Sequence, residues 1–166
     1  MFDIKTCCLY VFGGWSNRWL GDTWKVNVSP IIGPPYAGKG EFIDTNGIDV
    51  YTAGPAEATK AIFMIYDIFG YSSQILEGAD KLAEHYRIFM PDFFEGKPAP
   101  MDWMPMDGGV PDEAKMDDFC NGPGETQQTL RKLESLVTTF QELHPEIKAW
   151  GLLGYCWGGY VSHQPL

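Results

Sequence analysis

The stretch that decides the fold is KAWGLLGYCWGGY, residues 148–160. Its first half, Lys148–Leu153, is a short apolar run typical of a buried strand. Its second half is a Gly-x-Cys-x-Gly-Gly turn that precedes an expected helix, and such a turn holds its central residue, here Cys156, in a sharp, exposed position. Glycines are needed because the helix crosses close to the strand. These turn glycines are Gly154, Gly158 and Gly159. The unit predicts an α/β fold with a nucleophilic thiol.

Cys156 has the surroundings that thiol chemistry requires. It lies at the expected N-terminus of a helix, where the positive end of the helix dipole favours the thiolate. The backbone N–H of Trp157 would point at an oxyanion that develops on a bound substrate. The alternative is a buried structural cysteine in a glycine-rich turn. The preceding strand and the double glycine favour the nucleophile.

The rest of the chain from Gly40 onward supplies a sheet and helices around this unit. Asn46-Gly47 between two short apolar runs predicts a hairpin, because both positions tolerate positive φ. Apolar runs and a 3.6-residue period alternate after the hairpin, which predicts a parallel sheet covered by helices. The expected strands are Glu41–Asp44, Ile48–Tyr51, Ala61–Tyr66, Arg87–Met90 and Lys148–Leu153, and the expected helices are Gln74–Tyr86 and Glu125–Leu143. Residues 92–124, with five prolines, are expected to form a long loop.

The N-terminal residues have a different composition, rich in Trp, Gly and Pro. Leu9–Phe12 and Trp24–Val28 are expected strands, and residues 29–40 are an expected linker. We therefore divide the chain into a segment at residues 1–38 and a domain at residues 39–166.

The composition of the chain argues against several classes of binding partner and cofactor. The formal net charge of −10 argues against nucleic acid or an anionic membrane as the main partner. Four scattered cysteines fit neither a disulfide scaffold nor a metal site, so we expect a cytoplasmic protein that needs no metal or organic cofactor. The apolar run Cys7–Phe12 is too short for a membrane span, and no small-residue cleavage site follows it.

Several short stretches at characteristic positions give a family resemblance. They are Gly40-Glu41-Phe42, Tyr66-Asp67-Ile68-Phe69-Gly70, Met90-Pro91-Asp92-Phe93-Phe94 and Gly154-Tyr155-Cys156-Trp157-Gly158-Gly159. Residues from about 39 to 161 resemble the dienelactone hydrolase family, particularly its fungal members. The resemblance implies a three-layer α/β-hydrolase fold. It also implies hydrolysis of a small ester or lactone by a Cys-His-Asp triad through an acyl-cysteine.

The resemblance assigns two more residues to the site. Asp67 matches the acid that contacts the nucleophile in the family, although a lone Asp at this point is equally typical of an N-terminal turn or cap. The backbone N–H of Ile68 matches the second oxyanion donor.

The chain departs from the family pattern after Cys156. In this fold the triad acid and histidine follow the nucleophile in sequence, but here ten residues follow it, with His163 as their one histidine and no acid. His163 would lie about 10 Å along the helix from Cys156, so it cannot act as its base. We therefore expect the N-terminal portion of the fold, and a catalytically incomplete fragment or a pseudoenzyme is the first alternative function.

Residues 9–28 carry a second resemblance. Leu9–Gly14 followed by Gly21–Val26 is similar to a single kelch repeat. Kelch repeats build propeller blades, and a propeller needs several of them. A kelch-type interaction module is therefore the second alternative function.

Overall fold

The computed structural model describes residues 36–104, 110 and 112–164, together with the backbone of three strands at 2–3, 8–12 and 23–27. The described strands form two sheets. The first has β1 (Phe2–Asp3), β2 (Cys8–Phe12) and β3 (Thr23–Asn27). The second has β4 (Glu41–Thr45), β5 (Ile48–Ala53), β6 (Lys60–Ile65), β7 (Arg87–Pro91) and β8 (Ala149–Gly154). The helices are α1 (Ser73–Leu82), α2 (Glu113–Cys120), α3 (Thr126–Leu143) and α4 (Trp157–Ser162), with a 3-10 turn η1 (Met101–Trp103).

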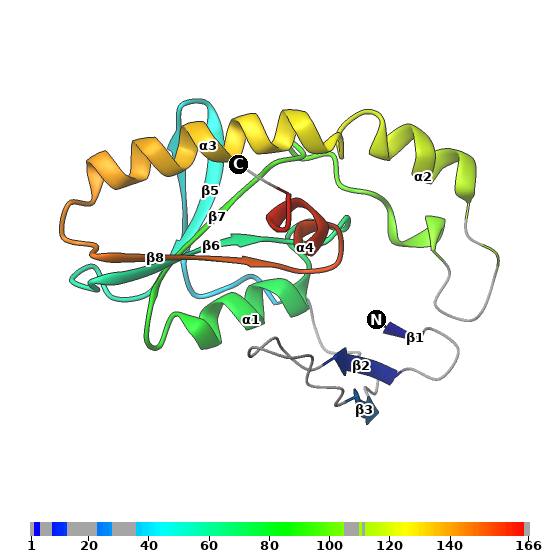
Figure 1. Cartoon of the computed structure of the whole chain (residues 1–166), viewed down its shortest axis with the longest axis horizontal. Helices are drawn as coiled ribbons and strands as arrows, with labels where there is room; N and C mark the ends of the chain where they lie inside the picture. Colours follow the sequence, from blue (N-terminus) through cyan, green and yellow to red (C-terminus); the bar gives the residue numbers. More distant parts are fainter. Residues whose placement is uncertain are drawn as a thin grey trace.

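The larger sheet has the strand order β4-β5-β7-β6-β8 (Figure 1). Strands β7, β6 and β8 are parallel, as their connection through helices predicts. Strands β4 and β5 pair antiparallel around Asn46 and Gly47, whose φ angles of 57° and 79° confirm the hairpin. Because β5 also pairs antiparallel with β7, the sheet is mixed and not wholly parallel.

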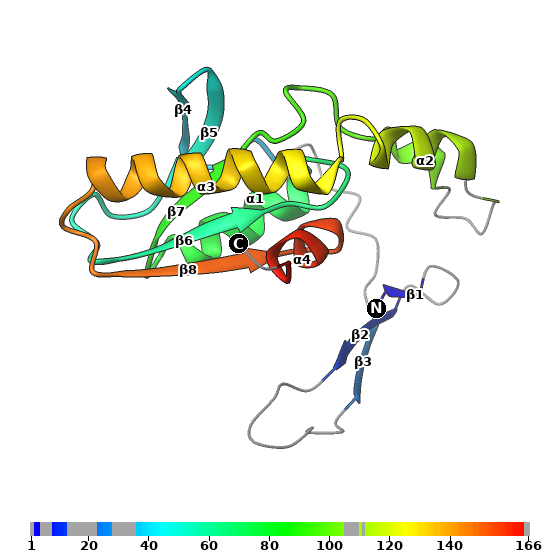
Figure 2. The same cartoon turned by 45° about the horizontal axis from the view of Figure 1, so that its top comes forward.

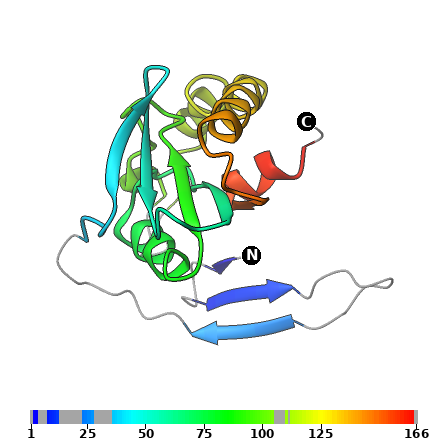
Figure 3. The ribbon, with the colours of Figure 1, turned by 90° about the vertical axis from the view of Figure 1, so that its left-hand side faces the viewer.

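Helices cover both faces of the larger sheet. Figure 3 shows α1 against one face and α3 with α4 against the other. On the α3 side Phe140 contacts Phe63 of β6 and Phe89 of β7, with ring centroids 5.6 Å and 4.4 Å apart. Helix α3 runs opposite to β8, so its first turn and α4 lie at the same end of the sheet (Figure 2). The three-layer α/β arrangement is therefore confirmed.

The segment between β7 and α3 differs from the expected loop, because it contains η1 and α2. The sequence did not predict α2, because prolines surround it and its amphipathic pattern is weak. Phe119 is its one buried side chain, and the Asp112 carboxylate caps it by accepting a hydrogen bond from the backbone N–H of Lys115. Helix α1 is also shorter than expected and ends at Leu82, with Ala83 as its C-cap.

A buried carboxylate ties the start of the domain to α1. Asp80, 7% exposed, accepts hydrogen bonds from the hydroxyls of Tyr36 and Tyr51 and from the backbone N–H of Lys39, at 2.5–2.7 Å. The hydrogen bond to Asp80 is the main reason that the pKa of Tyr36 rises to about 12. Residues 36–40 thus pack against the domain that contains the larger sheet.

The N-terminal strands agree with the sequence pattern. Strand β2 pairs antiparallel with β3, at the positions where Leu9–Phe12 and Trp24–Val28 predict strands. Most of the expected linker, residues 29–35, lies outside the described residues. In the part that is described, no helix combines the length and apolar character that crossing a membrane requires.

Candidate active site

Cys156 occupies the turn between β8 and α4. The strand ends at Gly154 and the helix begins at Trp157. The backbone of Cys156 has φ 51° and ψ −111°, a conformation that a residue with a side chain rarely adopts. A positive φ is also what the glycine-rich pattern at residues 154–159 leads us to expect. This turn, the elbow, lies between a strand and a helix, as that pattern predicts.

Close backbone contacts require two of the three turn glycines. A Cβ on Gly154 would lie 2.1 Å from the Gly158 carbonyl oxygen. A Cβ on Gly158 would lie 2.3 Å from the carbonyl oxygen of Ile65 and 2.5 Å from that of Tyr66. All three distances are too short for real atoms, whereas a Cβ on Gly159 would be merely tight, at 3.3 Å from the Gly154 carbonyl oxygen. The first helical turn thus rests directly on the end of β6.

Two hydrogen bonds fix the turn to its neighbours. The backbone N–H of Tyr155 donates to the Ile65 carbonyl at 3.0 Å. The buried indole N–H of Trp157 donates to the Gly124 carbonyl, also at 3.0 Å. The elbow is therefore held by β6 on one side and by the loop before α3 on the other.

Two effects at Cys156 oppose the thiolate that the helix dipole is expected to favour. Burial raises the pKa of this thiol, and the nearby Asp67 carboxylate raises it further. The backbone N–H of Trp157 lowers the pKa without reversing the shift. A six-residue helix offers too little dipole to outweigh desolvation and a like charge.

Asp67 lies just beyond β6, and its charge raises the pKa of the Cys156 thiol. Burial raises the pKa of Asp67 itself, while a hydrogen bond from the backbone N–H of Phe69 at 2.8 Å lowers it. The backbone carbonyl of Asp67 accepts from the N–H of Gly70 at 3.1 Å. Asp67 therefore has the hydrogen bonds of a turn residue, and its contact with the thiol stays a prediction.

Ile68 is buried in the same loop. Its carbonyl oxygen accepts a hydrogen bond from the backbone N–H of Ala99 at 2.8 Å, which fixes the orientation of the following peptide. A Cβ on Gly70 would lie 3.1 Å from the Pro98 ring, so residues 98–99 pack directly on this loop.

None of the three histidines lies beside Cys156. His163 is the exposed C-cap of α4, at the far end of the helix that begins at the elbow. His144 caps the C-terminus of α3 and His85 precedes β7. Both sit where strands begin, so about 20 Å of strand separates His144 from the thiol.

Cys156 lines neither of two surface grooves that lie among the described residues. One, of about 340 Å³, lies between the β4–β5 hairpin and α3 and includes Ile48 and Arg131. The other, of about 230 Å³, lies beside Asp80. Among the described side chains, no three His, Cys, Asp or Glu residues gather into a set that could hold a metal ion.

Comparison with known proteins identifies the family of the chain. A family model described as the dienelactone hydrolase family matches residues 48–165. The chain belongs to the dienelactone hydrolase family. The match includes β5 through α4 and thus every residue discussed above as part of the site. The kelch resemblance of residues 9–28 finds no support in these comparisons.

Individual relatives give the extent of the similarity. An uncharacterized AIM2 family protein of Schizosaccharomyces pombe is 35% identical over 129 residues, which are 76% of this chain and 51% of that protein. The carboxymethylenebutenolidase homolog of Rattus norvegicus is 33% identical over 136 residues, 78% of this chain and 50% of that protein. A flagellar outer-arm dynein alpha chain of Chlamydomonas reinhardtii is 76% identical over 37 residues, 22% of this chain and 1% of the dynein. The chain thus spans about half the length of the Schizosaccharomyces pombe and Rattus norvegicus relatives.

Proposed function

We propose that this dienelactone hydrolase family member opens a small ester or lactone, with Cys156 as the nucleophile. The observation that carries the proposal is the positive φ of Cys156 at the turn between β8 and α4. A strained turn of this kind presents one side chain to a substrate and leaves its neighbouring N–H free to bind an oxyanion. The rat relative is named a carboxymethylenebutenolidase homolog, which suggests that the substrate is a lactone.

The first chemical step forms a bond between Sγ of Cys156 and the acyl carbon. The carbonyl oxygen becomes an oxyanion, and the N–H groups of Trp157 and Ile68 are its proposed donors. The carbon–oxygen bond then breaks, and the leaving alkoxide takes up a proton. Because an ordinary thiol is mostly protonated at neutral pH and burial raises the pKa of this one, its proton must be removed during attack. Asp67 is the proposed acceptor, since burial raises its pKa and so makes it a better base.

The proposed location is the cytoplasm. Cys120 and Cys156 are free thiols in the described part of the chain, which suits a reducing compartment. The proposed partner is the small substrate, with no nucleic acid or membrane partner.

Acylation by p-nitrophenyl acetate tests the nucleophile. We expect a burst of nitrophenolate and an acetyl group on the peptide that contains Cys156, located by mass spectrometry. Cys156→Ala should abolish both signals. Cys120→Ala is the matched control, because Cys120 is also free and exposed, and it should leave them unchanged. Acetylation that survives in Cys156→Ala would contradict the assignment.

A further inference from the structure

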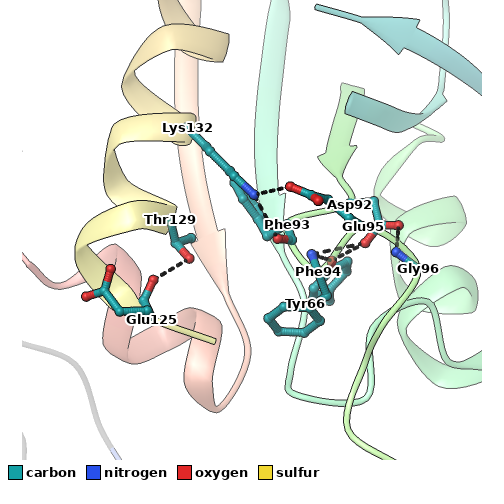
Figure 4. Close-up of polar contacts among 9 residues, drawn as sticks. All are labelled: Tyr66, Asp92, Phe93, Phe94, Glu95, Gly96, Glu125, Thr129 and Lys132. Atoms are coloured by element: carbon teal, nitrogen blue, oxygen red, sulfur yellow. Dashed lines mark hydrogen bonds and ion pairs between the residues drawn. The ribbon is translucent and has the colours of Figure 1, made fainter. Parts of the chain in front are cut away.

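Tyr66 carries a buried hydroxyl that the proposed chemistry does not use. The residue is 0% exposed and lies between β6 and Asp67. Its hydroxyl donates to Oδ1 of Asp92 at 2.7 Å and accepts from the backbone N–H of Phe94 at 3.1 Å (Figure 4). Both partners come from the loop that follows β7. The hydroxyl therefore joins the loops that leave two neighbouring strands.

The loop that receives this hydroxyl is itself held firmly. Asp92 also accepts hydrogen bonds from the backbone N–H groups of Phe94 and Gly96, at 3.2 Å and 2.8 Å. The ammonium group of Lys132 on α3 pairs with Glu95 at 2.6 Å and reaches the Phe93 carbonyl at 3.4 Å (Figure 4). These contacts hold the loop of residues 92–96 in place between the sheet and α3.

The backbone of Tyr66 lies directly under the elbow. Its carbonyl oxygen is one of the atoms that leave no room for a Cβ on Gly158. The next residues in the chain are Asp67 and Ile68, the proposed acid and the proposed second oxyanion donor. A shift of the Tyr66 side chain would therefore move both of these groups relative to Cys156.

Phe94 extends the same connection to the other oxyanion donor. Its ring centroid lies 4.9 Å from that of Tyr66 and 4.8 Å from that of Trp157. Phe94, whose backbone N–H donates to the Tyr66 hydroxyl, therefore also packs against Trp157, the residue after Cys156. One small cluster contacts both sides of the proposed oxyanion site.

We propose that Tyr66 is a positioning residue whose hydroxyl, held by Asp92 and the N–H of Phe94, sets the spacing between the oxyanion N–H groups of Ile68 and Trp157. The inference rests on the proposed function of Cys156. If the loops after β6 and β7 separate, the buried Tyr66 hydroxyl and its partners lose their hydrogen bonds. Any other spacing between the two N–H groups therefore costs free energy. Precise spacing matters because oxyanion donors act only at hydrogen-bond distance from the developing charge.

Two reactions of the same thiol test the proposal in the Tyr66→Phe variant. Acylation by p-nitrophenyl acetate passes through an oxyanion, whereas alkylation by iodoacetamide does not. We expect the acylation rate at Cys156 to fall about tenfold or more, because a misplaced donor contributes little. The alkylation rate should stay within about twofold, because alkylation needs no oxyanion donor and Asp67 keeps its charge in this variant.

Tyr51→Phe is the matched control. Tyr51 is also 0% exposed and donates to a carboxylate, that of Asp80, but it lies away from the elbow. It should leave the ratio of acylation to alkylation unchanged. If Tyr66→Phe does not fold, the isosteric Asp92→Asn keeps one acceptor oxygen for Tyr66 and should show a smaller loss of the same selective kind.

The outcomes separate the two proposals. Suppose that Cys156 is acylated normally in the parent chain. An unchanged ratio of acylation to alkylation in Tyr66→Phe, or in Asp92→Asn where that variant is used instead, would then overturn the positioning role alone. An equal loss of acylation and alkylation would show a general structural effect and would also overturn it. Absence of acylation at Cys156 in the parent chain would overturn the proposed function and, with it, this inference.

Discussion

Two effects raise the pKa of the Cys156 thiol. Burial is the larger, and the charge of the Asp67 carboxylate adds to it. A raised pKa lowers the thiolate fraction, and the thiolate is the form that oxidants and alkylating agents attack. At the residue scale, part of the reactivity of Cys156 therefore depends on a group far away in the sequence.

Replacing Asp67 with asparagine should make Cys156 more reactive. The substitution removes the like charge, so the pKa of the thiol should fall and more thiolate should exist at neutral pH. We expect iodoacetamide to label Cys156 several-fold faster at pH 7, with the midpoint of the rate-against-pH curve moved to lower pH. The introduced amide keeps an oxygen to accept from the Phe69 N–H, so the turn should persist.

The control for this variant is Asp118→Asn, which removes one charge from an exposed position on α2 near Cys120. Its Cys156 profile should match that of the parent chain. A Cys156 profile that is unmoved in Asp67→Asn would show that burial alone sets the pKa.

The sequence predicted which residues form the site better than it predicted their properties. Gly154, Cys156 and Gly158 follow from local spacing, because the turn needs those residue types wherever it occurs. The pKa of Cys156 could not be predicted, because desolvation depends on what packs around the thiol. Tyr66 and Asp92 were missed for the same reason: their hydrogen bond joins two loops that only the sheet brings together.

Among the elements, the contact between α4 and β6 is the closest in the site, and Gly158 makes it possible. Gly158→Ala should displace α4, because its Cβ would fall 2.3 Å from the Ile65 carbonyl oxygen and nothing there can give way. We expect a loss of about 2 kcal/mol or more in the free energy of unfolding, measured by urea denaturation, as for other overpacked sites. Acylation of Cys156 should fall with it.

Gly78→Ala provides the matched control on α1. A Cβ there would meet the Tyr155 hydroxyl at an ordinary 3.7 Å. Alanine also favours a helix over glycine by up to about 1 kcal/mol, so this variant should be as stable as the parent chain or more so. Equal stability of the Gly158→Ala and parent chains would contradict the proposed closeness of α4 and β6.

Element predictions succeeded where the periodicity is strong. The hairpin at Asn46-Gly47, the parallel strands β6, β7 and β8, and the long helix α3 follow from turn chemistry and regular apolar spacing. Helix α2 could not be recognised, because a single buried side chain, Phe119, leaves almost no periodic signal. The antiparallel pairing of β5 with β7 depends on tertiary contacts that no local pattern contains.

For the whole molecule, β8 forms an edge of the sheet. In the part of the chain that is described, it pairs on one side with β6, and Leu152 remains 40% exposed. The apolar run Lys148–Leu153 predicts a buried strand, but the residues of β8 are exposed or half-buried, because β8 has a neighbour on one side in the described structure. Such an edge favours pairing with a further strand.

The chain of residues 1–166 should acylate once and then stop. Acylation needs the thiol, oxyanion donors and a nearby carboxylate, all of which are grouped at the ends of β6 and β8. Deacylation needs a base that activates water at the thioester, and His85, His144 and His163 all lie away from Cys156. We expect about one equivalent of nitrophenolate per thiol, with acetyl-Cys156 accumulating, as measured by stopped-flow absorbance and mass spectrometry.

Supplying a base should release the trapped acyl group. The part of the Schizosaccharomyces pombe relative outside the 51% that this chain matches can be co-expressed as a separate polypeptide. If it pairs with the β8 edge and brings the acid and histidine that follow the nucleophile in this fold, it should convert the single burst into steady turnover. The same polypeptide with its histidines replaced by alanine should bind without restoring turnover. Steady turnover by residues 1–166 alone, abolished in Cys156→Ala, would instead mean that a base within this chain reaches the thioester.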